Sequence, residues 1–180
     1  ESSPMKSAYG LRVPVDDGEL ARVGPGTPCG ELMRRYWWSV YLSEDLKDLP
    51  KRIRILGEDL VAFRDGRGRA GLLFFHCSHR GTSLEYGRVE KEGLRCCYHG
   101  WLYDIEGQVV EMPLEPAGSS FRDSIQQPCY SVKEFGGLVF AYMGPLEDMP
   151  QFPKYDVWMR EGGKFKARLD LRVGGAMDCN

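Results

Sequence analysis

The chain has 180 residues and a mass of 20.4 kDa, which is enough for one compact domain and part of a second. Charged residues make up 28% of it and hydrophobic residues 42%, the composition of a folded globular protein rather than of a disordered or fibrous one. Lysine and arginine total 24 against 26 aspartate and glutamate, so the net charge of −2 gives no support to a nucleic-acid-binding protein.

The first predicted element is a short helix over residues 30–36, with Thr27 as its N-cap and Pro28 at its first helical position. After it, apolar and polar side chains alternate with a period of two, which predicts strands. Strands are expected at 51–55 and 60–64, joined by a turn at 57–59, and then at 70–75, 93–96, 101–105, 109–111, 130–134 and 138–142. Many short strands separated by glycine-rich turns predict a mostly β chain: a small antiparallel β domain with a short N-terminal helix.

The remaining segments predict the domain boundaries. Residues 112–128 contain prolines and paired serines and are expected to form a long loop, and residues 146–163 are expected to form a linker. Residues 164–173 alternate like one more strand, which cannot bury itself alone. We therefore expect an N-terminal extension at 1–20, a first domain at 21–145, and the first strand of a truncated α+β domain at 164–180. The first twenty residues lack the apolar core of a secretory leader, which predicts a cytoplasmic location.

Potential metal-ligating residues are concentrated in one part of the chain. Of the six cysteines, three lie singly in unrelated segments, namely Cys29, Cys129 and Cys179. The other three lie beside all three histidines of the sequence. Because cysteine and histidine are the scarcest ligand residues here, their clustering predicts a metal site.

Two short boxes contain these residues. The first is Cys77-Ser78-His79 and the second is Cys96-Cys97-Tyr98-His99, with 16 residues between His79 and Cys96. Each box falls between predicted strands, so the two can face one another as hairpin tips. Two thiolates and two imidazoles suit zinc or an iron–sulfur centre. Spacing alone leaves open whether Cys96 or Cys97 is the second thiolate.

The string CSHRGTSLEYGRVEKEGLRCCYHGWLYD resembles the Rieske motif in its oxygenase version. The resemblance implies that Cys77 and Cys96 bind one iron of a [2Fe–2S] cluster and that His79 and His99 bind the other. It also implies that the glycines after the boxes, Gly81 and Gly100, let the backbone approach the cluster and donate N–H groups to its sulfides. The alternative is a structural zinc module, although zinc fingers usually place two cysteines before two histidines, whereas here the order interleaves.

Neighbouring residues are assigned supporting roles. His76 lies outside the motif spacing and is expected at a strand end or in support of a ligand, and Cys97 is expected as a small, partly buried thiol. Trp101 and Tyr103 are expected to cover the cluster with hydrophobic surface. Four basic residues can either guide an acidic electron donor or simply be solvated, namely Arg80, Arg88, Lys91 and Arg95.

Respiratory Rieske proteins carry an extra cysteine in each box, and the two form a disulfide. The matching positions here are Thr82 and Tyr98, so that bridge cannot form. Trp101 stands where those proteins carry a serine that bonds a cluster sulfur. The resemblance therefore implies a potential near the lower end of the Rieske range, about −150 mV.

The resemblance extends over residues 22–37 and 137–145, which are similar to the N-terminal half of Rieske non-haem iron aromatic-ring oxygenases of the phthalate dioxygenase type. It implies a chain that passes electrons from a flavin/iron–sulfur reductase to a mononuclear ferrous iron in a following domain. There dioxygen would hydroxylate or demethylate an aromatic substrate, in a homotrimer. No catalytic residue is assigned, because the sequence holds no further pair of histidines for that iron. The alternative is a stand-alone Rieske ferredoxin-type electron carrier.

Overall fold

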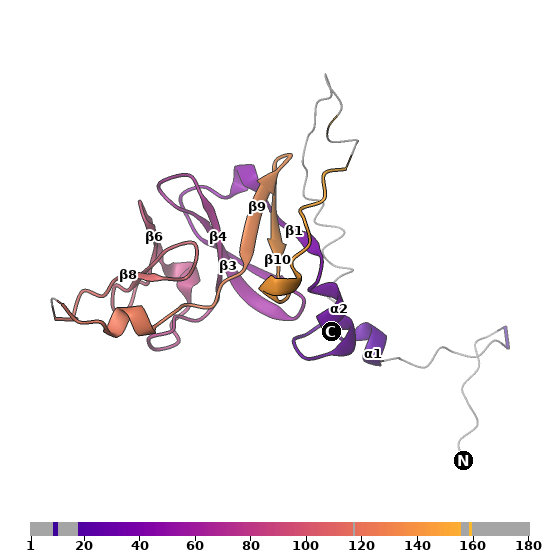
Figure 1. The fold of residues 1–180 in the computed structure, drawn as a ribbon, viewed down its shortest axis with the longest axis horizontal. Coiled ribbons are helices and arrows are strands. Elements are labelled where there is room, and N and C mark those ends of the chain that lie inside the picture. The colour runs from indigo at the N-terminus through magenta and orange to yellow at the C-terminus, as the bar shows by residue number, and fades with distance from the viewer. Residues whose placement is uncertain (1–8, 11–17, 117, 156–158, 160–180) are drawn as a thin grey trace, which may run out of the picture.

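The computed structural model describes residues 9–10, 18–116, 118–155 and 159. Within these ranges the chain is mostly β, as predicted, with three antiparallel sheets and two short helices. Figure 1 shows the sheets side by side along the long axis of the molecule, with both helices at one end. The strand predicted at 164–173, and with it the predicted start of a second domain, lies outside the described residues.

Helices α1 (Gly18–Ala21) and α2 (Pro28–Met33) form the N-terminal end. Thr27 caps α2 as predicted, because its hydroxyl oxygen accepts a hydrogen bond from the Gly30 N–H at 3.2 Å. Helix α2 ends earlier than residue 36. After Arg34 the backbone hydrogen bonds tighten to a spacing of three residues, and the indole N–H of Trp38 donates to the carbonyl of Met33 at 2.7 Å.

The central sheet has the order β2 (Lys51–Ile55), β3 (Glu58–Arg64), β4 (Ala70–Phe74). The turn predicted at 57–59 is wrong, since Glu58 already pairs with Ile55. Leu56 and Gly57 complete the turn alone, with φ of 47° and 76°. Two consecutive residues of positive φ make the tight two-residue hairpin that matches the twist of the flanking strands.

A second sheet has the order β1 (Trp37–Leu42), β10 (Leu138–Tyr142), β9 (Ser131–Phe135). Strands β9 and β10 follow the prediction closely, whereas β1 was not predicted. The register of β1 against β10 shifts between Ser39 and Tyr41. This irregularity breaks the alternation that identifies a strand in a sequence.

The third sheet has the order β5 (Arg88–Glu90), β6 (Gly93–Arg95), β7 (Leu102–Tyr103), β8 (Val109–Glu111). Strand β5 was not predicted, and β7 is shorter than the predicted strand at 101–105. Short 3-10 turns lie between strands at Ser43–Asp45, Leu84–Tyr86 and Phe121–Ser124, and another follows β10 at Leu146–Asp148.

Strand β3 is buried on both faces because it lies between two hydrophobic core clusters. Val61 points into one cluster, which contains both Cys77 and Cys96. Leu60 points into the other, which contains residues of β10. The cysteines of both boxes are therefore part of a packed core. No helix in the described part of the chain is long and apolar enough to span a bilayer.

Candidate metal centre

The two Cys–His boxes occupy loops that follow β4 and β6, and both loops have the same backbone pattern. The N–H of each cysteine donates to the carbonyl five residues further on. Cys77 donates to Thr82 at 2.9 Å, and Cys96 donates to Trp101 at 2.8 Å. The two boxes therefore form equivalent turns, although their histidines stand two and three residues after the cysteine.

Gly81 and Gly100 close these turns. Their φ values of 71° and 74° lie in the left-handed region that favours glycine. Their N–H groups donate to the carbonyls of Cys77 and Cys96, at 2.8 Å and 3.1 Å. These two N–H groups are engaged within the turns, so N–H groups donated to a cluster would come from other residues of the loops. Glycine is needed because the turn requires a positive φ.

The structure brings Cys77 and Cys96 together and separates Cys97 from them. Both Cys77 and Cys96 are 4% exposed, whereas Cys97 is exposed to solvent. The expectation of a partly buried Cys97 is wrong, because adjacent residues of the turn point in different directions and only Cys96 faces the core. The geometry thus selects Cys96 over Cys97 as the partner of Cys77.

The thiol pair is polarised by its surroundings. The Cys96 thiol lowers the pKa of Cys77 to about 5, helped by the Tyr103 hydroxyl and by backbone N–H groups, although burial opposes the change. The pKa of Cys96 is raised, because its proton is held against the Cys77 sulfur and burial disfavours a second charge. One thiolate therefore forms readily, and a cation is needed to stabilise two.

Tyr103 does more than cover the site. Its side chain is fully buried, and its hydroxyl lies 3.0 Å from the Sγ of Cys77. A thiolate at Cys77 would accept a hydrogen bond from this hydroxyl. The backbone of the loops adds to the effect: the N–H groups of His79 and Arg80 also lower the pKa of Cys77.

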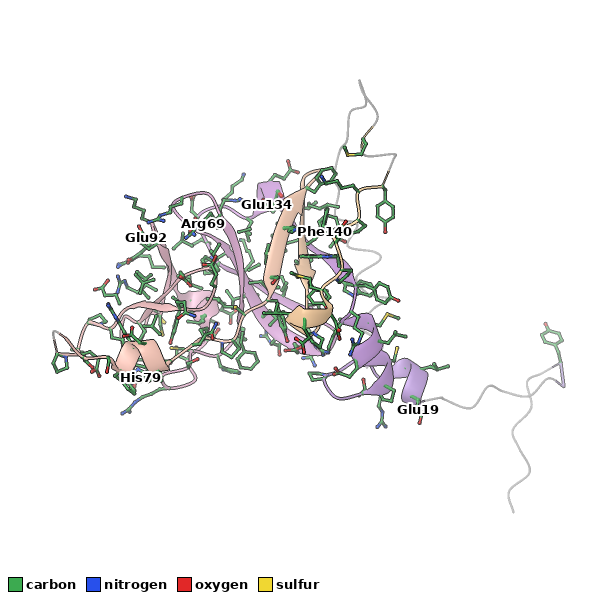
Figure 2. The ribbon with its side chains drawn as sticks, in the orientation of Figure 1. Glu19, Arg69, His79, Glu92, Glu134 and Phe140 are labelled. Carbon is green, nitrogen blue, oxygen red and sulfur yellow. The ribbon has the colours of Figure 1, made fainter. Side chains whose placement is uncertain are left out.

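The two imidazoles also form a pair. The ring centroids of His79 and His99 are 4.6 Å apart, with the rings nearly perpendicular at 68°. Both side chains are half-buried. Trp101 stacks on His79, with the ring centroids 4.4 Å apart and the ring planes at 9° to one another, and so covers one face of this imidazole. Figure 2 shows His79 near the end of the molecule that carries β6 and β8, far from Glu19 in α1.

The residue before each cysteine reaches the glycine that closes the loop. Nδ1 of His76 lies 2.8 Å from the carbonyl oxygen of Gly81. Nη1 of Arg95 donates to the carbonyl of Gly100 at 2.5 Å. The ring of His76 therefore supports the first loop from a strand end, the role expected for it. Its equivalent in the second loop is Arg95.

Arg95 is also fully engaged with carboxylates. Its guanidinium donates to Glu90 at 2.7 and 2.8 Å and to Glu111 at 2.5 Å. Arg88 donates to the same Glu90. These hydrogen bonds lower the pKa of Glu90 to about 2. Arg88 and Arg95 are therefore neutralised within the chain, which argues against a role for them in guiding an acidic donor.

Gln127 is a buried polar residue that the sequence did not indicate. Its side chain hydrogen-bonds Ser78, which stands between Cys77 and His79 in the first box. A glutamine in a polar loop carries no pattern that would single it out, because its partners lie about fifty positions away in the chain.

The donor set fits a two-iron cluster. Two buried thiols and two half-buried imidazoles form two adjacent pairs on equivalent turns, and such a mixed set is the one found in Rieske centres. In the described ranges, no group of three or more His, Cys, Asp or Glu side chains is arranged to hold one metal ion.

Two curated relatives with high identity to the chain are oxygenase subunits. The chain is 51% identical over 178 residues to the tert-butanol monooxygenase / tert-amyl alcohol desaturase oxygenase subunit of Aquincola tertiaricarbonis, covering 97% of this chain and 37% of that protein. It is 56% identical over 141 residues to the phenoxybenzoate dioxygenase subunit alpha of Ectopseudomonas oleovorans, covering 78% of this chain and 34% of the relative. The chain thus spans about a third of the length of these relatives.

Solved structures give the same result. Dicamba monooxygenase with non-heme iron and dicamba aligns with a TM-score of 0.64 and 26% identity, over 73% of this chain and 40% of that one.

The phthalate 4,5-dioxygenase oxygenase subunit of Pseudomonas putida is 46% identical over 79% of this chain and 33% of its own length, which confirms the resemblance to that type. Residues 36–135 match the model of the Rieske [2Fe-2S] domain. With its two equivalent Cys–His turns, the chain belongs to the Rieske [2Fe-2S] domain family.

Proposed function

We propose that this chain is the electron-transfer part of an oxygenase terminal component. Cys77 and Cys96 would hold one iron of a [2Fe–2S] cluster, and His79 and His99 would hold the other. The observation that carries the proposal is the pairing of buried thiols with half-buried imidazoles on two equivalent turns. When bound, such a cluster supplies reversible one-electron transfer, at a potential raised by its neutral histidine ligands.

The side chains of this site have complementary tasks. Burial of Cys77 and Cys96 keeps water from the sulfurs, and the Tyr103 hydroxyl stabilises negative charge at Cys77. The rings of His79 and His99 are half-buried, so part of each ring reaches the surface. We infer that electrons leave the site through the edges of these rings.

We propose the following partners for the whole protein. A flavin/iron–sulfur reductase supplies the electrons, and a mononuclear ferrous iron in the domain that begins at 164–180, after the linker at 146–163, uses them with dioxygen. Support comes from the oxygenase names of the relatives and from the non-heme iron of the dicamba monooxygenase structure. A homotrimer and a cytoplasmic location complete the proposal.

The proposed substrate is aromatic, and the reaction is hydroxylation or demethylation. Relatives named for phenoxybenzoate, phthalate and 5,5'-dehydrodivanillate, the last an O-demethylase subunit of Sphingobium sp. (strain NBRC 103272 / SYK-6), favour this class. The relative named for tert-butanol indicates an aliphatic alcohol as the competing class. Oxygen consumption by the whole protein with an aromatic acid and with a tertiary alcohol distinguishes the two.

The carrier alternative has less support, because the relatives described above are oxygenase subunits of about three times the length of this chain. Iron and acid-labile sulfide per chain in anaerobically purified protein test the cluster itself. About two of each are expected, with a paramagnetic resonance signal only after reduction. Stoichiometric zinc without sulfide would refute the proposal.

A further inference from the structure

The amide of Gln127 is fully buried and uses all of its hydrogen-bonding capacity. Its Oε1 accepts from the backbone N–H of Ser78 at 2.8 Å and from the Ser78 hydroxyl at 2.7 Å. Its Nε2 donates to the carbonyls of Phe74 at 3.0 Å and His76 at 2.9 Å. One side chain thus joins the end of β4 to the centre of the first Cys–His box.

The backbone of Gln127 is held as tightly as its side chain. Its N–H donates to the carbonyl of Gly107 at 2.8 Å. Gly107 has a φ of 76°, and a Cβ there would lie 2.0 Å from the carbonyl oxygen of Gln127. The neighbouring Pro128 carbonyl accepts from the N–H of Phe74 at 2.8 Å. Gln127 therefore approaches the first box from a rigid position.

Ser78 is the residue whose peptide plane separates Cys77 from His79. The closing bonds of the loop, from Cys77 to Thr82 and from Gly81 to Cys77, constrain its ends. The bond from the Ser78 N–H to Gln127 constrains its middle. The directions of the thiol and the imidazole relative to one another depend on this peptide plane.

We propose that Gln127 is a positioning residue for the cluster. Its amide holds the first box in the conformation that presents Cys77 and His79 together, and its loss loosens this loop while the sheets stay folded. The inference rests on the proposed function, since Cys77 and His79 matter as a pair only if they bind the same cluster.

Three variants of the 180-residue chain test this role. Gln127→Met keeps the length of an unbranched side chain and removes all of its hydrogen bonds. Gln127→Glu keeps an acceptor for Ser78 but removes the donors to the two carbonyls. Gln126→Met is the matched control, because Gln126 is the exposed neighbour and its amide donates only to the Glu106 carbonyl, at 3.1 Å.

Two measurements are made on each variant. The first is amide hydrogen exchange at Ser78 in the metal-free chain, with the amides of the paired residues Val61 in β3 and Leu73 in β4 as reporters of global stability. The second is the rate at which a chelator removes the cluster from the loaded chain, together with the g values of the reduced form. The first readout is independent of whether a cluster binds.

For Gln127→Met we expect about tenfold faster exchange at Ser78 and about tenfold faster cluster loss, with shifted g values and unchanged exchange at Val61 and Leu73. Gln127→Glu should keep the protection of Ser78 while losing the cluster faster than Gln126→Met, and it serves as the test if the methionine variant does not fold. Equal rates of cluster loss in the Gln127 variants and the control would overturn the proposal, as would an equal rise in exchange at all three amides. Failure of the wild-type chain to bind iron and sulfide would refute the proposed function instead.

Discussion

Tyr103→Phe is expected to lower the reduction potential of the cluster. The substitution removes a single hydroxyl, 3.0 Å from the Sγ of Cys77. Reduction adds negative charge to the cluster and its thiolates, so a hydrogen bond donated to Cys77 stabilises the reduced form more than the oxidised form. Because Tyr103 is fully buried, water cannot replace the lost donor.

The size of the effect follows from the strength of such a bond. A hydrogen bond to a charged group contributes about 1.5–3 kcal/mol, and we take about 1–2 kcal/mol as the part that differs between the two redox states. For a one-electron couple, 1 kcal/mol corresponds to about 40 mV. The potential of Tyr103→Phe should therefore lie about 40–80 mV below that of the wild-type chain, itself expected near −150 mV.

A redox titration followed by visible circular dichroism measures this difference. Tyr86→Phe is the matched control, because Tyr86 is 72% exposed and its hydroxyl is available to water. It should leave the potential unchanged. A Tyr103→Phe potential within about 10 mV of the wild type would refute the reasoning, since the hydroxyl would then not distinguish the two redox states.

Three further predictions concern the ligands, the buried ion pair and the acid stability. Cys96→Ser should abolish the visible absorption of the cluster, whereas Cys97→Ser should preserve it, because only Cys96 faces Cys77. Bleaching of the Cys97 variant would reverse the assignment. Arg34→Met should lower the free energy of unfolding by about 3 kcal/mol, measured by chemical denaturation, because it leaves the Glu58 carboxylate without its buried partner. Arg35→Met removes an exposed ion pair and should lower it by less than about 1 kcal/mol, and equal losses in the two variants would contradict the prediction. The folded-state pKa of Glu90 is lowered to about 2, so the stability that its charge contributes is present above about pH 4.3 and is lost as the pH falls toward 2. The difference in melting temperature between the wild type and Glu90→Gln should therefore shrink over that range. A constant difference would show that the charge of Glu90 is not involved.

Some features of this protein follow from neighbouring residues alone. The Cys–His boxes are visible because ligand type and spacing are properties of a few consecutive positions. Thr27 and Pro28 predicted the start of α2 for the same reason, since a helix cap depends on the residues within one turn.

Other features were decided by contacts between distant segments. Cys96 and Cys97 are adjacent and chemically identical, and only the packing of Cys96 against the core beside Cys77 separates them. Strand β1 pairs with β10 about a hundred residues away, across a shift in register that disrupts its pattern.

Gln127 is the clearest example of a residue whose role depends on contacts with distant segments. Its importance comes from four hydrogen bonds to groups some fifty residues earlier in the chain. Local sequence thus fixes the residue types and the spacing of the candidate ligands, because coordination chemistry depends on residue type. Their relative orientation is set by the tertiary structure, because the buried groups that hold the loops come from other parts of the fold.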